Sequence, residues 1–233
     1  MTDTEALRRR SCIVAVDVPD LAAARHLLAL TQDHFDWYKI GLQLFLAEGH
    51  AVVDVFKRRG KRVFLDLKLH DIPATVGKAA QAVAHLEPDL LTVHASGGRA
   101  MVQAAVDALR GRTEVIAVTV LTSLSPDDAQ RMWQGSPSAL AQRWLAEPQA
   151  AGAAGFVCSP HEVQELKSIW PHGRAVVPGI RFGGADAGDQ KRIATPAAAL
   201  RGGADWLVIG RPITEAPDLG AAVSALDADL ATI

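Results

Sequence analysis

The sequence predicts an α/β fold, a (β/α)8 barrel that spans residues 1–233 as a single domain. Eight short apolar runs recur along the chain, and each is followed by a segment with helical spacing of its apolar residues. The runs are continuous rather than alternating, which is typical of parallel strands covered on both faces. Eight units of about 29 residues also match the usual size of such a barrel. A doubly wound open sheet is the alternative, but the turn after the first run lacks a G-x-G-x-x-G nucleotide motif.

The first four units cover the amino-terminal half. We expect strands at 12–17, 36–40, 63–68 and 90–95. The spacing of Leu21, Ala24, Leu27 and Leu28 predicts the first helix, and an amphipathic pattern predicts one long helix over 42–57. Pro73 suits the first turn of a helix that runs to about His85. Gly97 and Gly98 open the next helix, which ends near Gly111.

The last four units follow the same order. We expect strands at 114–121, 155–159, 174–180 and 205–210. A long polar connection after the first of these precedes a helix near 138–151. Further helices are expected at 160–169 and 194–202, and the chain closes with a helix that ends near Leu230.

Composition excludes several classes of protein. Apolar residues make up 49% and charged residues 21%, so the chain forms a core rather than a disordered ensemble. The 24 basic and 26 acidic residues give a net charge of −2, which argues against a nucleic-acid or membrane-surface partner. The polar start MTDTEALRRR does not resemble a signal peptide, and no apolar run is long enough to span a membrane. Cys12 and Cys158 lie in apolar runs and are expected to be buried free thiols, so we expect a cytoplasmic protein.

Ionisable and polar residues gather at the carboxyl ends of the predicted strands, where barrel enzymes place their chemistry. They are Asp17, Lys39, Asp66, Lys68, Asp71, His94, Thr122, Ser123, Arg181 and Arg211. His94 is open to two interpretations, a rim imidazole or a satisfied structural histidine. No HExxH motif or Cys/His cluster indicates a metal site.

The densest cluster is the segment DLKLHD at 66–71. Alternate residues of a strand share a face, so Asp66 and Lys68 point the same way. Two simpler interpretations stay open: a plain ion pair for Asp66 and Lys68, and a role for Asp71 as the N-cap or a first-turn acid of the following helix. Buried ion pairs are costly to assemble, however, and with Lys39 the cluster offers a proton donor beside a carboxylate.

A second group of residues predicts a phosphate site after the seventh and eighth strands. The segments VVPGIRFGGADAGDQKR and VIGRPI supply glycines, backbone N–H groups and arginines there. Gly210, Arg211 and Pro212 combine amide donors with a guanidinium at a helix start.

The motif FLDLKLHDIPATV at 64–76 resembles the signature of the orotidine 5′-phosphate decarboxylase family. Seven further segments occur in the family's order over nearly the whole chain: VAVDVP (14–19), WYKIG (37–41), VHASGG (93–98), VTVLTS (118–123), VPGIR (177–181), GDQKR (188–192) and VIGRPIT (208–214). The resemblance implies a homodimeric barrel without metal or cofactor. The implied reaction is decarboxylation of orotidine 5′-phosphate to UMP and CO2, the last step of de novo UMP synthesis.

The resemblance also implies a role for each residue. Lys68 would protonate C6 of the pyrimidine, Asp66 would lie against the substrate carboxylate, and Lys39 would complete the charged chain and touch the ribose. The remaining roles concern substrate contacts: Asp17 with the ribose hydroxyls, Thr122 or Ser123 with the pyrimidine, Asp71 and Thr75 in the partner subunit's site, and Arg181, Gln190, Gly210 and Arg211 at the phosphate end.

Two other functions compete with this one. A magnesium-dependent sugar-phosphate enzyme such as 3-hexulose-6-phosphate synthase shares the Asp–Lys–Asp strand end, but Lys39 puts a cation where a metal site would want an acid. A barrel that only binds nucleotides would have no need of the Asp66, Lys68 and Asp71 set.

Overall fold

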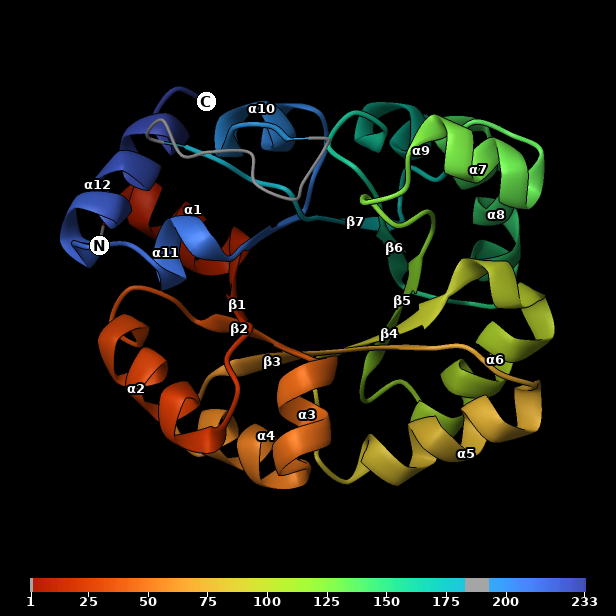
Figure 1. The fold of residues 1–233 in the computed structure, drawn as a ribbon, viewed down its shortest axis with the longest axis horizontal. Helices are drawn as coiled ribbons and strands as arrows, with labels where there is room; N and C mark the ends of the chain where they lie inside the picture. The colour runs from red at the N-terminus through yellow and green to blue at the C-terminus, as the bar shows by residue number, and fades with distance from the viewer. Residues whose placement is uncertain (1, 183–192) are drawn as a thin grey trace.

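The computed structural model describes residues 2–182 and 193–233, and its centre is a closed barrel of eight parallel strands (Figure 1). The strands are β1 (Cys12–Val16), β2 (Trp37–Gly41), β3 (Arg62–Leu69), β4 (Leu90–His94), β5 (Glu114–Val118), β6 (Gly155–Val157), β7 (Arg174–Val177) and β8 (Trp206–Ile209). Each strand pairs with the next in sequence, and β1 closes the ring by pairing with β8, with Ile13 opposite Val208. The predicted fold class is confirmed.

Helices form an outer layer around the barrel (Figure 1). They are α1 (Asp3–Ser11), α2 (Leu21–Thr31), α3 (Leu42–Glu48), α4 (His50–Lys57), α5 (Pro73–Ala84), α6 (Gly98–Leu109), α7 (Pro126–Trp133), α8 (Pro137–Ala150), α9 (Val163–Ile169), α10 (Pro196–Arg201), α11 (Arg211–Thr214) and α12 (Leu219–Leu230), with a 3-10 turn η1 (Ala95–Gly97) before α6.

Two apolar clusters hold the layers together. The inner one fills the barrel with side chains from alternate strand positions: Ile13, Ala15, Trp37, Phe64, Leu90, Ile116, Val176, Trp206 and Val208. The outer one is larger and includes the opposite face of the same strands, such as Val14 and Leu65, together with the buried faces of the helices. Because both faces are covered, the strands are apolar at nearly every position, as the continuous runs predicted.

The structure differs from the predicted elements in several places, and one of them is α1, a helix at the polar start of the chain where none was expected. The helix expected over 42–57 is two helices, α3 and α4, because Gly49 between them has φ +59° and breaks the α-helical path. The polar connection after β5 contains α7, whose start is fixed by a capping box between Ser125 and Asp128. The strands expected to reach 121 and 180 end at Val118 and Val177.

The amino-terminal end of the barrel is filled by aromatic and arginine side chains. The rings of Trp37 and Trp206 lie 5.3 Å apart, and the guanidinium groups of Arg62 and Arg174 lie 5.0 and 5.2 Å from the two ring centres. These contacts combine ring packing with cation–π attraction. They close this end, so the barrel presents its open cavity at the carboxyl ends of the strands.

The cysteines, an ion pair between two helices and the polarity of the helices complete the description of the fold. Cys12 and Cys158 are buried and are not joined in a disulfide, as predicted. Arg8 on α1 is 4% exposed and pairs with Asp227 on α12, which joins the first and last helices. Among the described residues, no helix is long and apolar enough to cross a membrane.

Candidate active site

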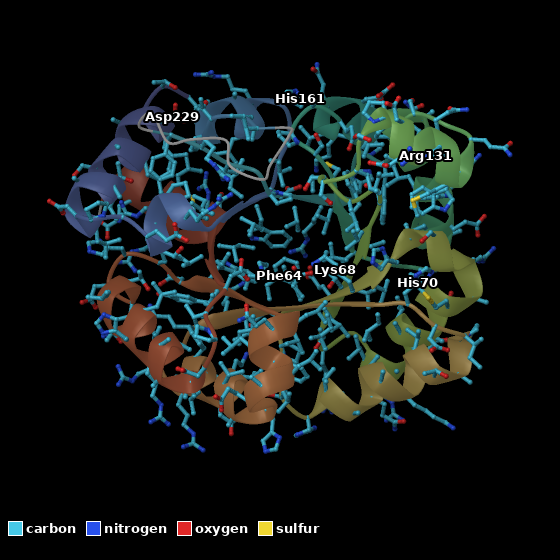
Figure 2. All side chains as sticks on the ribbon, viewed as in Figure 1. Phe64, Lys68, His70, Arg131, His161 and Asp229 are labelled. Carbon is cyan, nitrogen blue, oxygen red and sulfur yellow. The ribbon has the colours of Figure 1, made fainter. Side chains whose placement is uncertain are left out.

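A cavity of about 580 Å³ opens at the carboxyl ends of the strands. It brings together eight of the predicted residues from six different strands or the loops after them: Asp17, Lys39, Asp66, Lys68, Thr122, Arg181, Gly210 and Arg211. In Figure 2, Phe64 and Lys68 lie near the middle of the ring of strands, whereas His70 lies further out, toward α6. The predicted clustering of charge at one rim therefore holds for these residues.

Four of these side chains form a continuous chain of alternating charge. Lys39 Nζ lies 2.9 Å from Asp17 Oδ1 and 3.7 Å from Asp66 Oδ2. Lys68 Nζ lies 2.8 Å from the same Asp66 oxygen. Three adjacent strands, β1, β2 and β3, supply this arrangement, so its order follows from the order of the barrel.

Asp66 is the centre of the chain and is only 7% exposed. Burial alone would raise the pKa of its carboxyl, but Lys39, Lys68 and the hydroxyl of Thr92 together hold that pKa below its usual range. Asp66 therefore stays ionised at neutral pH, and its negative charge is fixed beside the Lys68 ammonium.

The backbone at Lys68 departs from regular strand geometry. Leu65 pairs with Leu91 and Leu69 with Val93, so four steps along β3 are matched by two along β4. Lys68 sits in this bulge with φ +49°, a left-handed conformation that costs an ordinary residue about 1–2 kcal/mol. Strained backbone of this kind is common where a side chain must be aimed at a site.

Close packing at Gly41 lets Asp17 and Lys39 meet. A Cβ atom at this position would lie 3.1 Å from Lys39 Nζ and 3.3 Å from Asp17 Oδ1. A side chain there would press on both charged groups, so the glycine at the end of β2 leaves room for the ion pair.

The part of the cavity wall that follows β7 and β8 carries the two predicted arginines. Arg181 follows β7, is 9% exposed and donates a hydrogen bond from one terminal nitrogen to the carbonyl oxygen of Ile180 at 2.8 Å. Arg211 is exposed and begins α11 directly after Gly210. The cavity thus has an acid–base wall and a cationic wall. The predicted phosphate ligand Gln190 lies outside the described residues.

Three predicted residues do not line this cavity. Asp71, Thr75 and Ser123 are not among its lining residues, and Asp71 and Thr75 are exposed on the surface of the chain. Asp71 accepts a hydrogen bond from the backbone N–H of Ile72 at 2.6 Å, and Ile72 rather than Asp71 is the N-cap of α5. The capping alternative for Asp71 is therefore wrong.

His94 lies near the charged residues of the site without lining the cavity. Its ring centre is 5.2 Å from that of His70, and it is not one of the described residues that line the cavity. Burial, together with the nearby His70 and Lys68, lowers the pKa of His94 to about 4. The imidazole is therefore neutral at physiological pH. In the part of the chain that the structure describes, no group of three or more His, Cys, Asp or Glu side chains is arranged to hold a metal.

The sequence reasoning missed residues beneath and beside the predicted ones. Thr92 on β4 is fully buried, and its hydroxyl donates a hydrogen bond to Asp66 Oδ1 at 2.9 Å. The cavity floor is apolar, and several of its residues stand two positions before a predicted residue, as Ala15 does before Asp17 and Phe64 before Asp66. This period of two could have identified them. Thr214 and Glu215, after β8, complete the wall near Arg211.

Comparison with known proteins places this geometry in a family. Residues 11–226 match the model of the family described as orotidine 5′-phosphate decarboxylase / HUMPS. A protein of Thermobifida fusca named orotidine 5′-phosphate decarboxylase is 50% identical over 220 residues, covering 93% of this chain and 94% of that protein. A protein of Sphingopyxis alaskensis with the same name is 47% identical over 218 residues, covering 93% and 97%.

Solved structures agree with this assignment. The crystal structure of orotidine 5′-phosphate decarboxylase from Lactobacillus acidophilus superimposes with a TM-score of 0.80 at 34% identity, covering 95% of this chain and 99% of that one. A conserved protein from Geobacillus kaustophilus superimposes with a TM-score of 0.81 at 32% identity, covering 94% and 99%. From the barrel, the charged strand ends and these matches, it follows that the chain belongs to the orotidine 5′-phosphate decarboxylase / HUMPS family.

Proposed function

We propose that this protein converts orotidine 5′-phosphate to UMP and CO2, the last step of de novo UMP synthesis, without a metal or cofactor. The observation that carries the proposal is the chain Asp17–Lys39–Asp66–Lys68, whose charges alternate along one wall of a cavity. The relatives that bear the name of this activity support it at 47% and 50% identity over nearly the whole chain.

The two walls of the cavity suit the two ends of the substrate. The phosphate fits the cationic wall, where Arg181, Gly210 and Arg211, with Gln190, would hold it. The pyrimidine then lies toward Lys68, with Thr122 at its edge. The ribose lies between the two ends, within reach of Asp17 and Lys39.

Lys68 supplies the proton in this mechanism. The bond between C6 and the carboxylate breaks, CO2 leaves, and the electron pair stays on C6. A fixed ammonium beside C6 stabilises that developing charge and then transfers its proton to it, so that a C–H bond replaces the C–C bond. Lys68 is left neutral and regains a proton from water before the next turnover.

Asp66 has two tasks in the proposed reaction. Its ionised carboxylate, 2.8 Å from Lys68 Nζ, holds that ammonium group aimed at the site. It also lies against the leaving carboxylate, and the repulsion between the two negative charges ends when neutral CO2 departs. Phosphate contacts are remote from the bond that breaks, so their binding energy can be used to hold the reacting group in this position.

The magnesium-dependent sugar-phosphate alternative fits the site less well. Such an enzyme needs a metal ion between carboxylates, and here the Lys39 ammonium lies between Asp17 and Asp66, at 2.9 and 3.7 Å. A barrel that only binds nucleotides would not need the buried Asp66 and the left-handed Lys68.

The direct test is to mix the purified protein with orotidine 5′-phosphate and follow the loss of its ultraviolet absorbance. We expect multiple turnovers that EDTA does not slow. Absence of turnover by folded protein would reject the proposal, and an activity on a hexulose phosphate that EDTA abolishes would favour the rival.

We propose further that the protein acts as a cytoplasmic homodimer in which Asp71 and Thr75 of each subunit enter the partner's site. Both residues are exposed in the single chain, and Ile72 between them is 66% exposed. Leu42 and Leu46, one turn apart on α3, are 47% and 78% exposed, so apolar surface is available for a second copy.

Subunit mixing tests this arrangement. Lys68→Ala and Asp71→Ala variants should each be impaired, whereas a mixture that has exchanged subunits should recover about a quarter of the wild-type sites, because each mixed dimer contains one intact site. A mixture no more active than its parts would show that Asp71 does not act across subunits.

A further inference from the structure

Thr92 lies directly beneath the charged chain, at the point where β3 and β4 lose regular pairing. It is 0% exposed and is not one of the described residues that line the cavity. Its hydroxyl nevertheless touches both residues at the centre of the proposed chemistry. We propose that Thr92 is a positioning residue that sets the relative placement of Asp66 and Lys68. This inference rests on the proposed function, but its geometric part can be tested without it.

Two hydrogen bonds share the hydroxyl oxygen of Thr92. Thr92 Oγ1 donates to Asp66 Oδ1 at 2.9 Å and accepts from the backbone N–H of Lys68 at 2.8 Å. A carboxylate only accepts and a backbone amide only donates, so the bridging group must do both. A hydroxyl meets this requirement, whereas an aliphatic side chain of the same shape does neither.

The bulge in β3 explains why this contact is needed. Between Leu65 and Leu69 the β3 chain does not pair in register with β4, so the Lys68 N–H has lost its regular strand partner. The Thr92 hydroxyl replaces that partner while Lys68 keeps its left-handed φ of +49°. The Thr92 side chain therefore satisfies a partly buried donor that the bulge would otherwise leave unpaired.

The same hydroxyl also restrains the ammonium group of Lys68. The other Asp66 oxygen, Oδ2, holds Lys68 Nζ at 2.8 Å, while Oδ1 is held by Thr92. Thr92 therefore restrains Lys68 at its backbone directly and at its ammonium through Asp66. Displacements of about 1 Å at a reacting group can cost about 100-fold in rate, so loss of both restraints should slow the chemical step more than substrate binding.

The test compares Thr92→Val, Thr92→Ala and Thr92→Ser with the wild type. We expect kcat to fall about 10- to 100-fold in the Val and Ala variants, with KM within about threefold, because Thr92 does not line the cavity. The Ser variant keeps the hydroxyl and should stay within about fivefold of the wild type. Thr113→Val is the matched control: Thr113 is 4% exposed and donates to the Pro88 carbonyl at 2.7 Å, at the start of β5. It should lose stability without losing kcat.

A second measurement does not depend on turnover. Amide hydrogen exchange at Lys68, followed by NMR in lysine-labelled protein, should be at least about tenfold faster in the Val and Ala variants than in the wild type and the Ser variant. The Thr92→Val variant places a methyl group against Asp66 and could fail to fold for that reason. In that case the comparison of Thr92→Ala, which leaves space there, with Thr92→Ser tests the role of the hydroxyl.

The outcomes separate the two proposals. An active wild type whose folded Val or Ala variant keeps kcat within about twofold, or keeps slow exchange at Lys68, would overturn the role of Thr92. An inactive wild type would reject the proposed function, and the exchange at Lys68 would then decide alone whether Thr92 holds this backbone.

Discussion

Lys68 combines an unusual backbone conformation with an ammonium group that is paired with Asp66. Its φ of +49° turns the side chain out of the strand pattern, and Asp66 at 2.8 Å fixes its Nζ. In the proposed mechanism it is the proton donor, so Lys68→Ala should lower kcat by several orders of magnitude while the protein still folds. Steady-state turnover of orotidine 5′-phosphate, with circular dichroism to verify folding, is the measurement.

A matched control for this change is Lys57→Ala. Lys57, at the end of α4, also pairs with an aspartate, Asp89 at 3.3 Å, but lies outside the cavity. The Lys57→Ala variant should therefore have the same kcat as the wild type. Near-normal turnover in well-folded Lys68→Ala protein would remove Lys68 from the mechanism.

His94 predicts a pH dependence of stability. Burial, His70 and Lys68 depress its folded-state pKa to about 4, whereas an unfolded histidine has a pKa of about 6.5. Between these values the unfolded chain binds the proton and the folded chain does not, so the free energy of unfolding should fall as pH drops from about 6.5 to about 4. Chemical denaturation at several pH values should show this slope reduced in His94→Gln. The same change at the exposed His172 is the control, and an unchanged slope in His94→Gln would contradict the prediction.

At the scale of residues, the sequence was sufficient to predict the charged residues of the site, because the strands that carry them are consecutive in the chain. Asp17, Lys39, Asp66 and Lys68 each lie in one of the first three strands or directly after it, and neighbouring strands in sequence are neighbours in the barrel. Thr92 was not predictable in this way, because its role depends on a bulge that the apolar pattern does not reveal. The roles of Asp71 and Thr75 stay predictions, since they concern a second subunit.

At the scale of elements, Gly49 decides that one predicted helix is two. It has φ +59° and ψ −140°, which an L-residue rarely adopts, and a Cβ atom added there would meet no heavy atom within 4 Å. Gly49→Ala should therefore lower the free energy of unfolding by about 1–3 kcal/mol through backbone strain alone. Urea denaturation measures the difference, and kcat should not change.

Gly77 on α5 provides the opposite case. A Cβ there would lie 3.4 Å from the Ala104 carbonyl oxygen, an ordinary contact in a regular helix. Gly77→Ala should be neutral or raise stability by up to about 1 kcal/mol. If both glycine substitutions had the same effect, backbone conformation would not be the reason for the break between α3 and α4.

The apolar pattern also explains which elements were predicted well. Helices and strands that face the core were identified because burial shapes their sequence, as in α5 and β4. The helix α7 fully buries only Ala129, so the search for buried apolar runs passed over it, although the capping box of Ser125 and Asp128 was present in the sequence. Strand ends beyond Val118 and Val177 were overestimated because the apolar runs continue into buried loops at Val120 and Ile180.

At the scale of the whole molecule, the first and last helices are tied by a buried arginine. Arg8 pairs with Asp227 and also donates from Nε to the His34 carbonyl at 3.2 Å. Arg8→Met would leave Asp227 without its counter-charge and should lower the free energy of unfolding by about 2–3 kcal/mol, since Asp227 is partly exposed.

The double variant separates the direct interaction of Arg8 with Asp227 from the other contacts of the two side chains. Arg8→Met with Asp227→Asn should cost less than the sum of the two single changes, by about 1 kcal/mol, if the two groups interact directly. Strict additivity in denaturant titrations would show that the pair contributes nothing beyond its separate contacts.

The prediction of the overall architecture rested on one feature of the sequence, its continuous apolar runs. Continuous apolar runs require two covered faces, and eight of them in one chain of 233 residues close a ring. The size of the cavity and the filling of the opposite end by Trp37, Trp206 and their arginines depend on side-chain packing across the barrel, which the order of elements does not specify.

The alternating chain has a further consequence for how an anion reaches the site. Two carboxylates and two ammonium groups at close spacing cancel one another, so their combined field dies away within a few ångströms of the wall. A phosphorylated molecule still in solution is then drawn mainly by Arg211, which is exposed, and by Arg181 behind it. Dissolved salt screens attraction beyond about 8 Å, so it slows the encounter, whereas the buried charge of Asp66 and the ammonium groups beside it are screened much less.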